Sequence, residues 1–478
     1  MDQKLFPLFL ILFMVTPGFS QSSENIEIIL SQMGETVIAV DNDLHNTYGL
    51  AYPVTYQFGI PSESDNLQAF RRFSETEEWS VLEEKTSDDF FNGIEVVRFD
   101  YEHDMAYVSV KFDAFSDSIF LKITDATGNN TEATCLGITQ YYDNRDAAVT
   151  SSADDWGEWS NEKFLRTARI FRDYHLWLSV GIVTQGCTAS TWEDIQNQLD
   201  SGYVEAVSHS QTHPNIPYGS IFSEVAGSKA DIINNLDLPA AWRKDDNEYV
   251  YVWIAPYGQY NADIAAVVSQ EKYLVSRMYY DQYHQYSNWD DQLEMFEEIG
   301  VSREVGPLWA GITDTILLNS TFDDVLNTGG VYHVMCHPNV IEWEEDYPWN
   351  HLDHISNRKN IWYAGLGHLY LYRLMQYPGS PTATKDPAEM MTNRYALSQN
   401  YPNPFKNATT ITYTLPDNEF VNISLFDLYG RHITTLVNQK QIAGVHQFSF
   451  HANDLPPGIY LYTMRTGKYM KSRKLIVD

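Results

Sequence analysis

The stretch Ser208–Asn215 reads Ser-His-Ser-Gln-Thr-His-Pro-Asn and comes directly after the apolar-leaning run Tyr203–Val207. Its two imidazoles, His209 and His213, are four residues apart. If His209 ends a strand and His213 lies in the following turn, their ring nitrogens can converge at the roughly 2.0–2.1 Å that zinc requires. The stretch therefore predicts two ligands of a metal site at the end of a strand.

A third ligand is predicted upstream, where a buried strand runs into paired carboxylates. Residues 147–155 read Ala-Ala-Val-Thr-Ser-Ser-Ala-Asp-Asp. Asp155 would complete a site of three protein ligands with one open position, the arrangement of catalytic zinc sites. Asp154, on the other side of the backbone, would then accept a proton from water. A helix N-cap with a solvated neighbour is the alternative interpretation of this pair.

From about residue 140 the chain alternates between strand-like and helix-like segments, which favours a parallel sheet. The predicted strands are 147–152, 176–183, 204–207, 249–254, 273–278 and 331–338, and the predicted helices are 161–174, 192–199, 225–236, 262–270 and 357–376. Polar candidates fall at the carboxyl ends of the strands, where parallel barrels place their sites. We therefore predict a (β/α) barrel over residues 136–376.

The order of these motifs resembles the polysaccharide deacetylase family over roughly residues 140–375. The resemblance is carried by a strand that ends in Asp-Asp and a later strand that ends in His-Ser-x-x-His. It implies that acetyl groups are removed from a polysaccharide or oligosaccharide with the help of one divalent metal, zinc being the expected ion. The family's metal ligands correspond here to Asp155, His209 and His213.

The resemblance also assigns the proton transfers. Asp154 matches the family's general base, and His337, at the end of a later strand, matches its general acid. Tyr257, in the pair Pro256-Tyr257, matches the residue whose backbone N–H stabilises the oxyanion. His333, on the same strand as His337, is expected in the core or a lower layer of the barrel.

Two departures from the family pattern concern the base. The family's Thr-Phe-Asp-Asp-Gly is Ser-Ala-Asp-Asp-Trp here, at 152–156, and its Arg-Pro-Pro-Tyr is Ile-Ala-Pro-Tyr, at 254–257. The missing arginine normally holds the base carboxylate. Arg277, at the end of the next strand, can take its place from a different side, and Asp281 can tune His337. Trp156 and Trp289, together with Trp159 and Tyr257, are candidates for stacking on sugar rings, with core packing as the alternative.

Both flanks of the barrel are predicted to be β-rich. Residues 1–20 have a basic start, a short apolar run and small residues before Gln21, which is typical of a secretory signal peptide. Residues 21–135 predict a β-sandwich-like accessory module with strands at 26–29, 36–40, 94–99, 106–112 and 116–127. Packing on its neighbour is the favoured role of this module, and glycan binding is the alternative. Residues 377–391, rich in Pro, Ser and Thr, predict a linker.

The last part of the chain, residues 392–478, predicts an Ig-like β-sandwich with strands at 409–415, 421–429, 432–437, 447–452, 458–465 and 469–477. Its beginning, Leu-Ser-Gln-Asn-Tyr-Pro-Asn-Pro-Phe at 397–405, is similar to that of type IX secretion sorting domains. Leu-Pro-Pro-Gly-Ile-Tyr at 455–460 and the basic segment 468–474 fit as well. The resemblance implies export by the type IX machinery to the medium or the cell surface.

Composition narrows the function classes. The formal net charge is −33, from 64 acidic and 31 basic residues, so the field of the protein repels nucleic acid and anionic lipid headgroups. No stretch is long and apolar enough to predict an integral membrane protein. With three cysteines at most one disulfide can form, and Cys336 is expected to be a small buried residue of a strand.

The predicted function is a secreted, metal-dependent carbohydrate deacetylase. Two alternatives stay open: a carbohydrate-binding protein that keeps the barrel and has lost turnover, and a metal hydrolase of a non-sugar amide or ester. The sequence contains no His-Glu-x-x-His and no Gly-x-Ser-x-Gly, which argues against a zincin protease and a serine esterase.

Overall fold

The computed structural model contains two compact units, Met1–Ser380 and Pro381–Asp478. In the first unit it describes residues 26–30, 34–278, 288–291, 301–304 and 313–376. In the second it describes residues 396–397, 400, 405–415, 418–427, 431–452, 455–467 and 470–477. The predicted signal peptide, residues 1–20, and the predicted linker, residues 377–391, lie outside these ranges.

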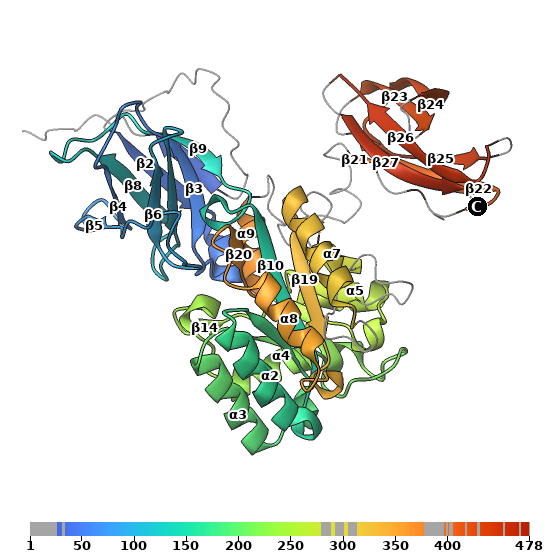
Figure 1. Ribbon diagram of the computed structural model, residues 1–478, viewed down its shortest axis with the longest axis horizontal. Coiled ribbons are helices and arrows are strands. Elements are labelled where there is room, and N and C mark those ends of the chain that lie inside the picture. Colours follow the sequence, from blue (N-terminus) through green and yellow to red (C-terminus); the bar gives the residue numbers. More distant parts are fainter. Residues whose placement is uncertain are drawn as a thin grey trace, which may run out of the picture. The chain divides into compact units, whose positions relative to one another are not determined.

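Two antiparallel sheets form the N-terminal part of the first unit, here called the β-module (Figure 1). One has the order β1-β2-β8-β4-β5, with bounds Ile26–Leu30, Glu35–Val40, Ser118–Thr124, Gln68–Arg72 and Ser80–Val81. The other has the order β6-β7-β3-β9, with bounds Val96–Asp100, Met105–Val110, Val54–Gly59 and Thr134–Ile138. The short helix α1 (Asn42–Tyr48) follows β2.

The β-module contains three longer strands that were not predicted, β3, β4 and β9. The central strand β3 explains why. It pairs with β7 on one edge and β9 on the other, and its consecutive residues Val54, Thr55 and Tyr56 are all buried. A strand covered on both faces lacks the alternation of apolar and polar residues by which half-buried strands are recognised.

A mostly parallel sheet forms the rest of the first unit, in the order β17-β16-β15-β12-β11-β10-β19-β18. The bounds in this order are Asn288–Asp291, Val275–Met278, Val252–Ile254, Val204–Ser208, Leu178–Ile182, Ala147–Trp156, Val331–Cys336 and Val301–Glu304. Only β17 is antiparallel to its neighbour among these strands. No ladder joins β17 to β18 among the described residues, so the predicted barrel is present there as an open sheet.

The long strand β10 pairs with three other strands of this sheet. Its residues 148–153 pair with β19 on one edge. On its other edge, residues 147–149 pair with β20 (Ile361–Tyr363) and residues 152–156 pair with β11. Strand β10 continues past its pairing with β19 and ends at Trp156, opposite Ile182 at the end of β11, so the polar residues at its end lie at the carboxyl edge of the sheet.

Helices connect the strands, as alternation in the sequence predicts. Their bounds are Asn161–Asp173 (α2), Ala189–Asp200 (α3), Ser228–Asn235 (α4), Ala262–Gln270 (α5), Thr315–Thr328 (α7), Asp346–Ile355 (α8) and Leu366–Gln376 (α9). Helix α2 buries Phe164, Ala168 and Phe171, which are spaced four and three apart and so form one apolar stripe. Helix α5 has the predicted bounds, whereas α7 and α8 were not predicted.

The prediction of one closing helix over Asn357–Gln376 is wrong in its first half. Ile361, Trp362 and Tyr363 form β20 instead, and all three side chains are buried. Branched and aromatic side chains suit a strand that packs on both faces better than a helix. The helix begins only at Leu366, after Gly365.

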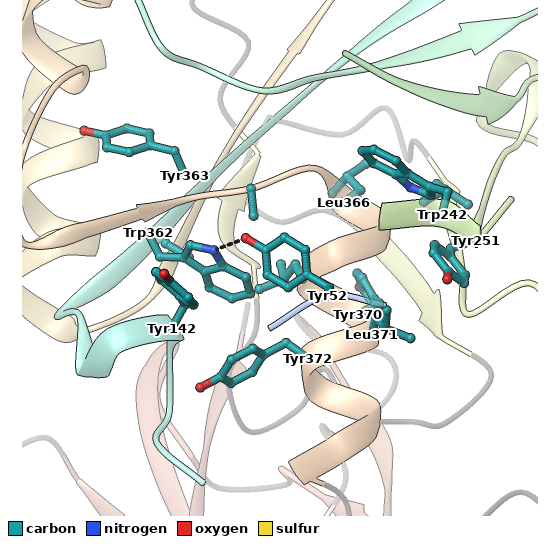
Figure 2. Close-up of a cluster of buried hydrophobic side chains, with 14 of the residues drawn as sticks. Tyr52, Tyr142, Trp242, Tyr251, Trp362, Tyr363, Leu366, Tyr370, Leu371 and Tyr372 are labelled. Carbon is teal, nitrogen blue, oxygen red and sulfur yellow. Dashed lines mark hydrogen bonds between the residues drawn. The ribbon is translucent and has the colours of Figure 1, made fainter. Parts of the chain in front are cut away.

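The β-module and the parallel sheet share one hydrophobic core, which includes Tyr52, Tyr142 and Trp362. Figure 2 shows the indole Nε1 of Trp362 donating a hydrogen bond to the hydroxyl of Tyr52, at 2.9 Å. Large aromatic side chains with satisfied polar atoms contribute strongly to such interfaces. The β-module thus packs firmly on its neighbour, as expected.

The second unit consists of two antiparallel sheets, β21-β22-β25 and β24-β23-β26-β27. The bounds in this order are Ala396–Leu397, Ala408–Leu415, Gly444–His451, His432–Gln441, Glu419–Asp427, Gly458–Arg465 and Met470–Val477. Both sheets contribute to one buried cluster, with Ile411 from β22 and Ile423 from β23 among its members. Each of the six predicted strands has a counterpart here, which supports the predicted sandwich.

Candidate metal centre

Three predicted metal ligands come together at the carboxyl edge of the parallel sheet. Oδ1 of Asp155, in β10, lies 3.3 Å from Nε2 of His209 and 3.1 Å from Nε2 of His213. His209 directly follows β12, and His213 lies in the turn beyond it. One ligand atom from each residue lies within 4.8 Å of the other two. A single small cation can therefore contact all three.

The backbone of the site is held in an unusual conformation. The angle φ is positive at Asp155 (76°), Ser210 (72°), His213 (57°) and Tyr257 (55°). Left-handed conformations cost non-glycine residues of order 1–3 kcal/mol and cluster at functional sites. At His213 the strain is supported locally, because its backbone N–H donates to Oγ of Ser210 at 2.8 Å.

The turn that carries His213 is held by a carboxylate that sequence reasoning missed. Oε2 of Glu224 accepts hydrogen bonds from the backbone N–H groups of Gln211 and Thr212, both at 2.9 Å. Its Oε1 accepts the Thr212 hydroxyl at 2.7 Å. Glu224 is buried and lies in the π-helical turn Ser223–Gly227, where a regular helix beginning at Val225 was predicted. A π-turn at a functional site is a frequent association, but nothing in the local sequence distinguishes this glutamate.

The protonation states of the three residues suit a metal. Nδ1 of His209 lies 2.9 Å from the carbonyl oxygen of Ile254, which can only accept, so Nδ1 carries the proton and the Nε2 lone pair faces Asp155. Burial and the neighbouring His209 lower the pKa of His213 and favour its neutral form. Burial raises the pKa of Asp155, but its interactions with the surrounding imidazoles of His209, His213 and His337 outweigh burial and lower that pKa to about 2, so the carboxylate is ionised. One ionised carboxylate and two neutral imidazoles are a fitting ligand set for zinc.

Asp154 lies beside the ligands, and its side chain points to the face of the sheet from which Arg277 also projects. It is 6% exposed, and its Oδ2 forms an ion pair with Nη2 of Arg277. Nη1 of the same guanidinium donates to Oγ of Ser152 at 3.1 Å. Oδ1 of Asp154 has no hydrogen-bond partner among the described residues. Asp154 therefore has an arginine partner, although position 254 holds the fully buried Ile254.

Two further predicted residues border the three ligands. Nε2 of His337, directly after β19, lies 3.7 Å from Oδ2 of Asp155. The ring of Tyr257, 57% exposed, packs edge-on against His213 with 4.4 Å between ring centroids. His333 lies deeper, as expected: it is fully buried, with Nδ1 2.8 Å from the hydroxyl of Thr150 and Nε2 3.0 Å from that of Ser152.

The aromatic candidates separate by burial. Trp156 is fully buried, stacks on Phe164 at 4.7 Å, and donates from Nε1 to Asn161. Of the two interpretations of Trp156, core packing therefore holds and stacking on substrate does not, because its ring belongs to the core under α2. Trp159, three residues on, is 58% exposed. Asp281 and the side chain of Trp289 lie outside the described residues.

The ring of Trp159 lies across two glycines. A Cβ added at Gly157 would meet the ring at 2.4 Å, and one added at Gly186 would meet it at 2.2 Å. Any larger residue at these positions would displace the ring. Two glycines thus allow a tryptophan to lie against the backbone, with more than half of its surface in solvent, four residues after Asp155.

The three cysteines are free thiols. Cys336 is fully buried in β19, which confirms the expectation of a small buried residue in a strand. Burial raises the pKa of its thiol well above the ordinary value. The chain therefore uses no disulfide for its stability.

The C-terminal unit matches a known family. Residues 399–478 match the family described as a secretion system C-terminal sorting domain. This part of the chain is a sorting domain. The sorting domain indicates export through the type IX secretion machinery, to the cell surface or the medium. No helix in the described ranges has the length and apolar character needed to cross a membrane.

A search of curated proteins finds no match. Among solved structures, a family 4 acetyl xylan esterase from Clostridium thermocellum in complex with a cobalt ion is 15% identical, with a TM-score of 0.29, covering 49% of this chain and 99% of that one. A peptidoglycan N-acetylglucosamine deacetylase is 11% identical, with a TM-score of 0.27, covering 47% and 87%. A CE4 family pseudoenzyme from Bacillus anthracis is 14% identical, with a TM-score of 0.28, covering 49% and 68%. Such scores leave the function to be argued from the side chains of the site.

Proposed function

We propose that the protein is a secreted, metal-dependent deacetylase that removes N- or O-acetyl groups from a polysaccharide or oligosaccharide. One observation carries the proposal: Asp155, His209 and His213 converge at one point of the sheet edge, with Asp154 and His337 beside them. Three ligands with an adjacent carboxylate and a further imidazole are what metal-assisted hydrolysis of an acetyl group needs.

The three ligands would hold one divalent ion, with Zn²⁺ as the favoured candidate because of the two imidazoles and one carboxylate. When bound, the ion supplies Lewis acidity, which polarises an acetyl carbonyl and acidifies water. The hydrogen bond from His209 to the Ile254 carbonyl keeps the imidazole in the orientation and tautomer that metal binding requires.

The proton transfers fall to residues that are not ligands. Asp154 accepts a proton from the attacking water, and the Arg277 guanidinium fixes the position of its carboxylate. His337, near the far oxygen of Asp155, donates a proton to the departing amine or alcohol of the sugar. The backbone N–H of Tyr257 is the proposed donor to the oxyanion that forms in between.

The remaining parts of the chain are assigned as follows. Residues 1–20 are a signal peptide, 21–135 an accessory β-module, 136–376 the catalytic barrel, 377–391 a linker and 392–478 the sorting domain. Support for the module boundary comes from the change at residue 147, where antiparallel pairing gives way to parallel strands. Support for the last boundary comes from the separation of the two compact units near residue 380.

The test is acetate release from acetylated xylan, chitin oligomers and peptidoglycan, measured with and without a chelator. The proposal expects release from at least one substrate, its loss with chelator, and its return with added metal. No release by protein that holds one metal ion per chain would favour the carbohydrate-binding alternative. Cleavage of small amides or esters alone would favour the non-sugar hydrolase. Restoring arginine at position 254 is not informative, since it would place a charge in the core.

A further inference from the structure

A cavity of about 300 Å³ lies away from the metal centre, where the β-module meets the amino ends of the parallel sheet. The β-module contributes the segments around Tyr52, Asn92 and Lys111, and the sheet side contributes Trp177, which precedes β11, and His368 of α9. Its volume is at the lower end of the roughly 300–1,000 Å³ of small-molecule sites. It is large enough for one sugar ring and distinct from the site at the carboxyl edge.

The imidazole of His368 is the first sign of a ligand. The residue is 1% exposed, and neither ring nitrogen has a hydrogen-bond partner in the part of the chain that the structure describes. Its faces are covered by Tyr52 and Trp242, each with 4.1 Å between ring centroids, and Trp177 meets its edge at 5.3 Å. A buried polar group left without a partner is costly, and His368 is one of the residues that line the cavity.

One positively charged side chain at the cavity, Lys111, is not neutralised by the acidic residue beside it. Glu95 also lines the cavity, but its carboxylate is paired with Arg71, at 3.0 Å between Oε1 and Nε, and accepts the backbone N–H of Lys111. Lys111 lines the cavity as well, and its ammonium group forms no salt bridge with a carboxylate of the described residues. This is unusual in a chain with 64 acidic and 31 basic residues.

We propose that this cavity binds a sugar residue that bears a carboxylate. The ammonium of Lys111 pairs with the carboxylate, the rings of Tyr52 and Trp177 contact the apolar face of the sugar, and His368 exchanges hydrogen bonds with its hydroxyls. Because the ligand contacts both the β-module and the sheet, its binding also stabilises their interface. The proposal does not depend on the function proposed for the metal centre.

The experiment is calorimetric titration of the full chain with sodium glucuronate, methyl glucoside and sodium acetate as probes. Each titration is run with the wild type and with the His209→Ala, His213→Ala double variant, so that binding at the metal centre is recognised. We expect one glucuronate per chain in both proteins, with methyl glucoside and acetate each at least about tenfold weaker. If acetate binds as tightly as glucuronate, the cavity does not recognise the sugar ring. If methyl glucoside binds as tightly, it does not recognise the carboxylate. Either result contradicts the proposal.

Three variants place the ligand. Lys111→Met and His368→Phe should each weaken glucuronate binding by about tenfold or more, the first by losing the charge and the second by losing the ring nitrogens. Ala241→Phe should fill the cavity and abolish binding. Lys85→Met is the matched control, because Lys85 belongs to the β-module but pairs with Glu83 at 2.6 Å. If Ala241→Phe fails to fold, Lys111→Met decides. No binding by the wild type, or unchanged binding by Lys111→Met, overturns the proposal.

Discussion

Arg277 of β16 forms an ion pair with Asp154 of β10, although three strands, β11, β12 and β15, lie between theirs in the sheet. Four interstrand steps of about 4.8 Å span roughly 19 Å of a flat sheet, farther than an arginine side chain reaches. The sheet must therefore curl until β16 faces β10. The ion pair thus lies inside the curl, above the layer that His333 and Ser152 form.

The two residues proposed for proton transfer should be separable from metal binding. Asp154→Asn and His337→Ala should each lower kcat for deacetylation by about 10²–10⁴-fold, because each removes one proton transfer. Both variants should retain one metal ion per chain by elemental analysis, since neither residue belongs to the three ligands. His103→Ala, at an exposed histidine paired with Asp100 in the β-module, is the control. Near wild-type turnover by Asp154→Asn would show that another group is the base.

The ion pair of Arg277 should matter for stability as well as for turnover. Arg277→Met leaves the Asp154 carboxylate buried without its partner and should cost roughly 3–5 kcal/mol in the free energy of unfolding. Adding Asp154→Asn removes the uncompensated charge, so the double variant should recover part of that loss in a double-mutant cycle followed by chemical denaturation. Additive losses would mean that the two side chains do not interact in solution.

Metal retention tests the ligands and the turn that carries one of them. The His209→Ala, His213→Ala double variant should hold no stoichiometric metal. Glu224→Gln should weaken metal affinity by about 10–100-fold, because an amide cannot accept all three hydrogen bonds that hold the turn of His213. The matched control is Glu193→Gln, at an exposed position of α3. Metal affinity that is unchanged by Glu224→Gln would assign this glutamate to stability alone.

Trp159 should act on long substrates only. If its exposed ring stacks on a sugar of the glycan, Trp159→Ala should raise KM for oligosaccharides by about 2- to 12-fold, which corresponds to an aromatic contact of about 0.5–1.5 kcal/mol. Hydrolysis of a small acetyl ester should not change. Trp159→Phe should have a KM for oligosaccharides close to that of the wild type. Phe115→Ala, at an 85% exposed ring of the β-module, is the control. An equal loss on both kinds of substrate would place Trp159 in the support of the metal site.

Glu205 should make stability fall as pH rises. This carboxyl, on strand β12, is buried against the start of α9, and burial raises its pKa from 4.5 to about 7 despite hydrogen bonds from Ser179 and the Gly367 backbone. The folded state therefore binds more protons than the unfolded state between these values. The stabilisation is complete below pH 4.5 and is lost as pH rises through 7, by about 3 kcal/mol over the whole interval.

The measurement for Glu205 is the free energy of unfolding between pH 5 and 8. Glu205→Gln stays neutral at every pH, so its free energy of unfolding should not show this decline with rising pH. Relative to the wild type, the variant should therefore be most favoured at the alkaline end of the range. Parallel curves for wild type and variant would contradict the raised pKa. The Glu193→Gln variant again serves as the control, because its carboxylate is exposed.

The sequence by itself determined the features that depend on neighbouring residues. The spacing of His209 and His213, a strand end followed by a turn, is local, and so is the run that ends in Asp154 and Asp155. Alternating strand and helix segments indicated a parallel sheet, and the strands of the sorting domain follow from their own alternation and turns. These patterns act through the backbone conformation of a few residues, which the sequence specifies directly.

Only the tertiary structure decided which distant side chains meet and which faces are covered. The pairing of Arg277 with Asp154 requires the curl of the sheet, and that of Glu224 with the turn before His213 requires a π-turn that no local signal indicates. Trp156 and Trp159 are near neighbours, yet α2 covers the first and leaves the second in solvent. Such outcomes depend on packing between elements, where the side of a strand or helix that faces its neighbour decides the role of each residue.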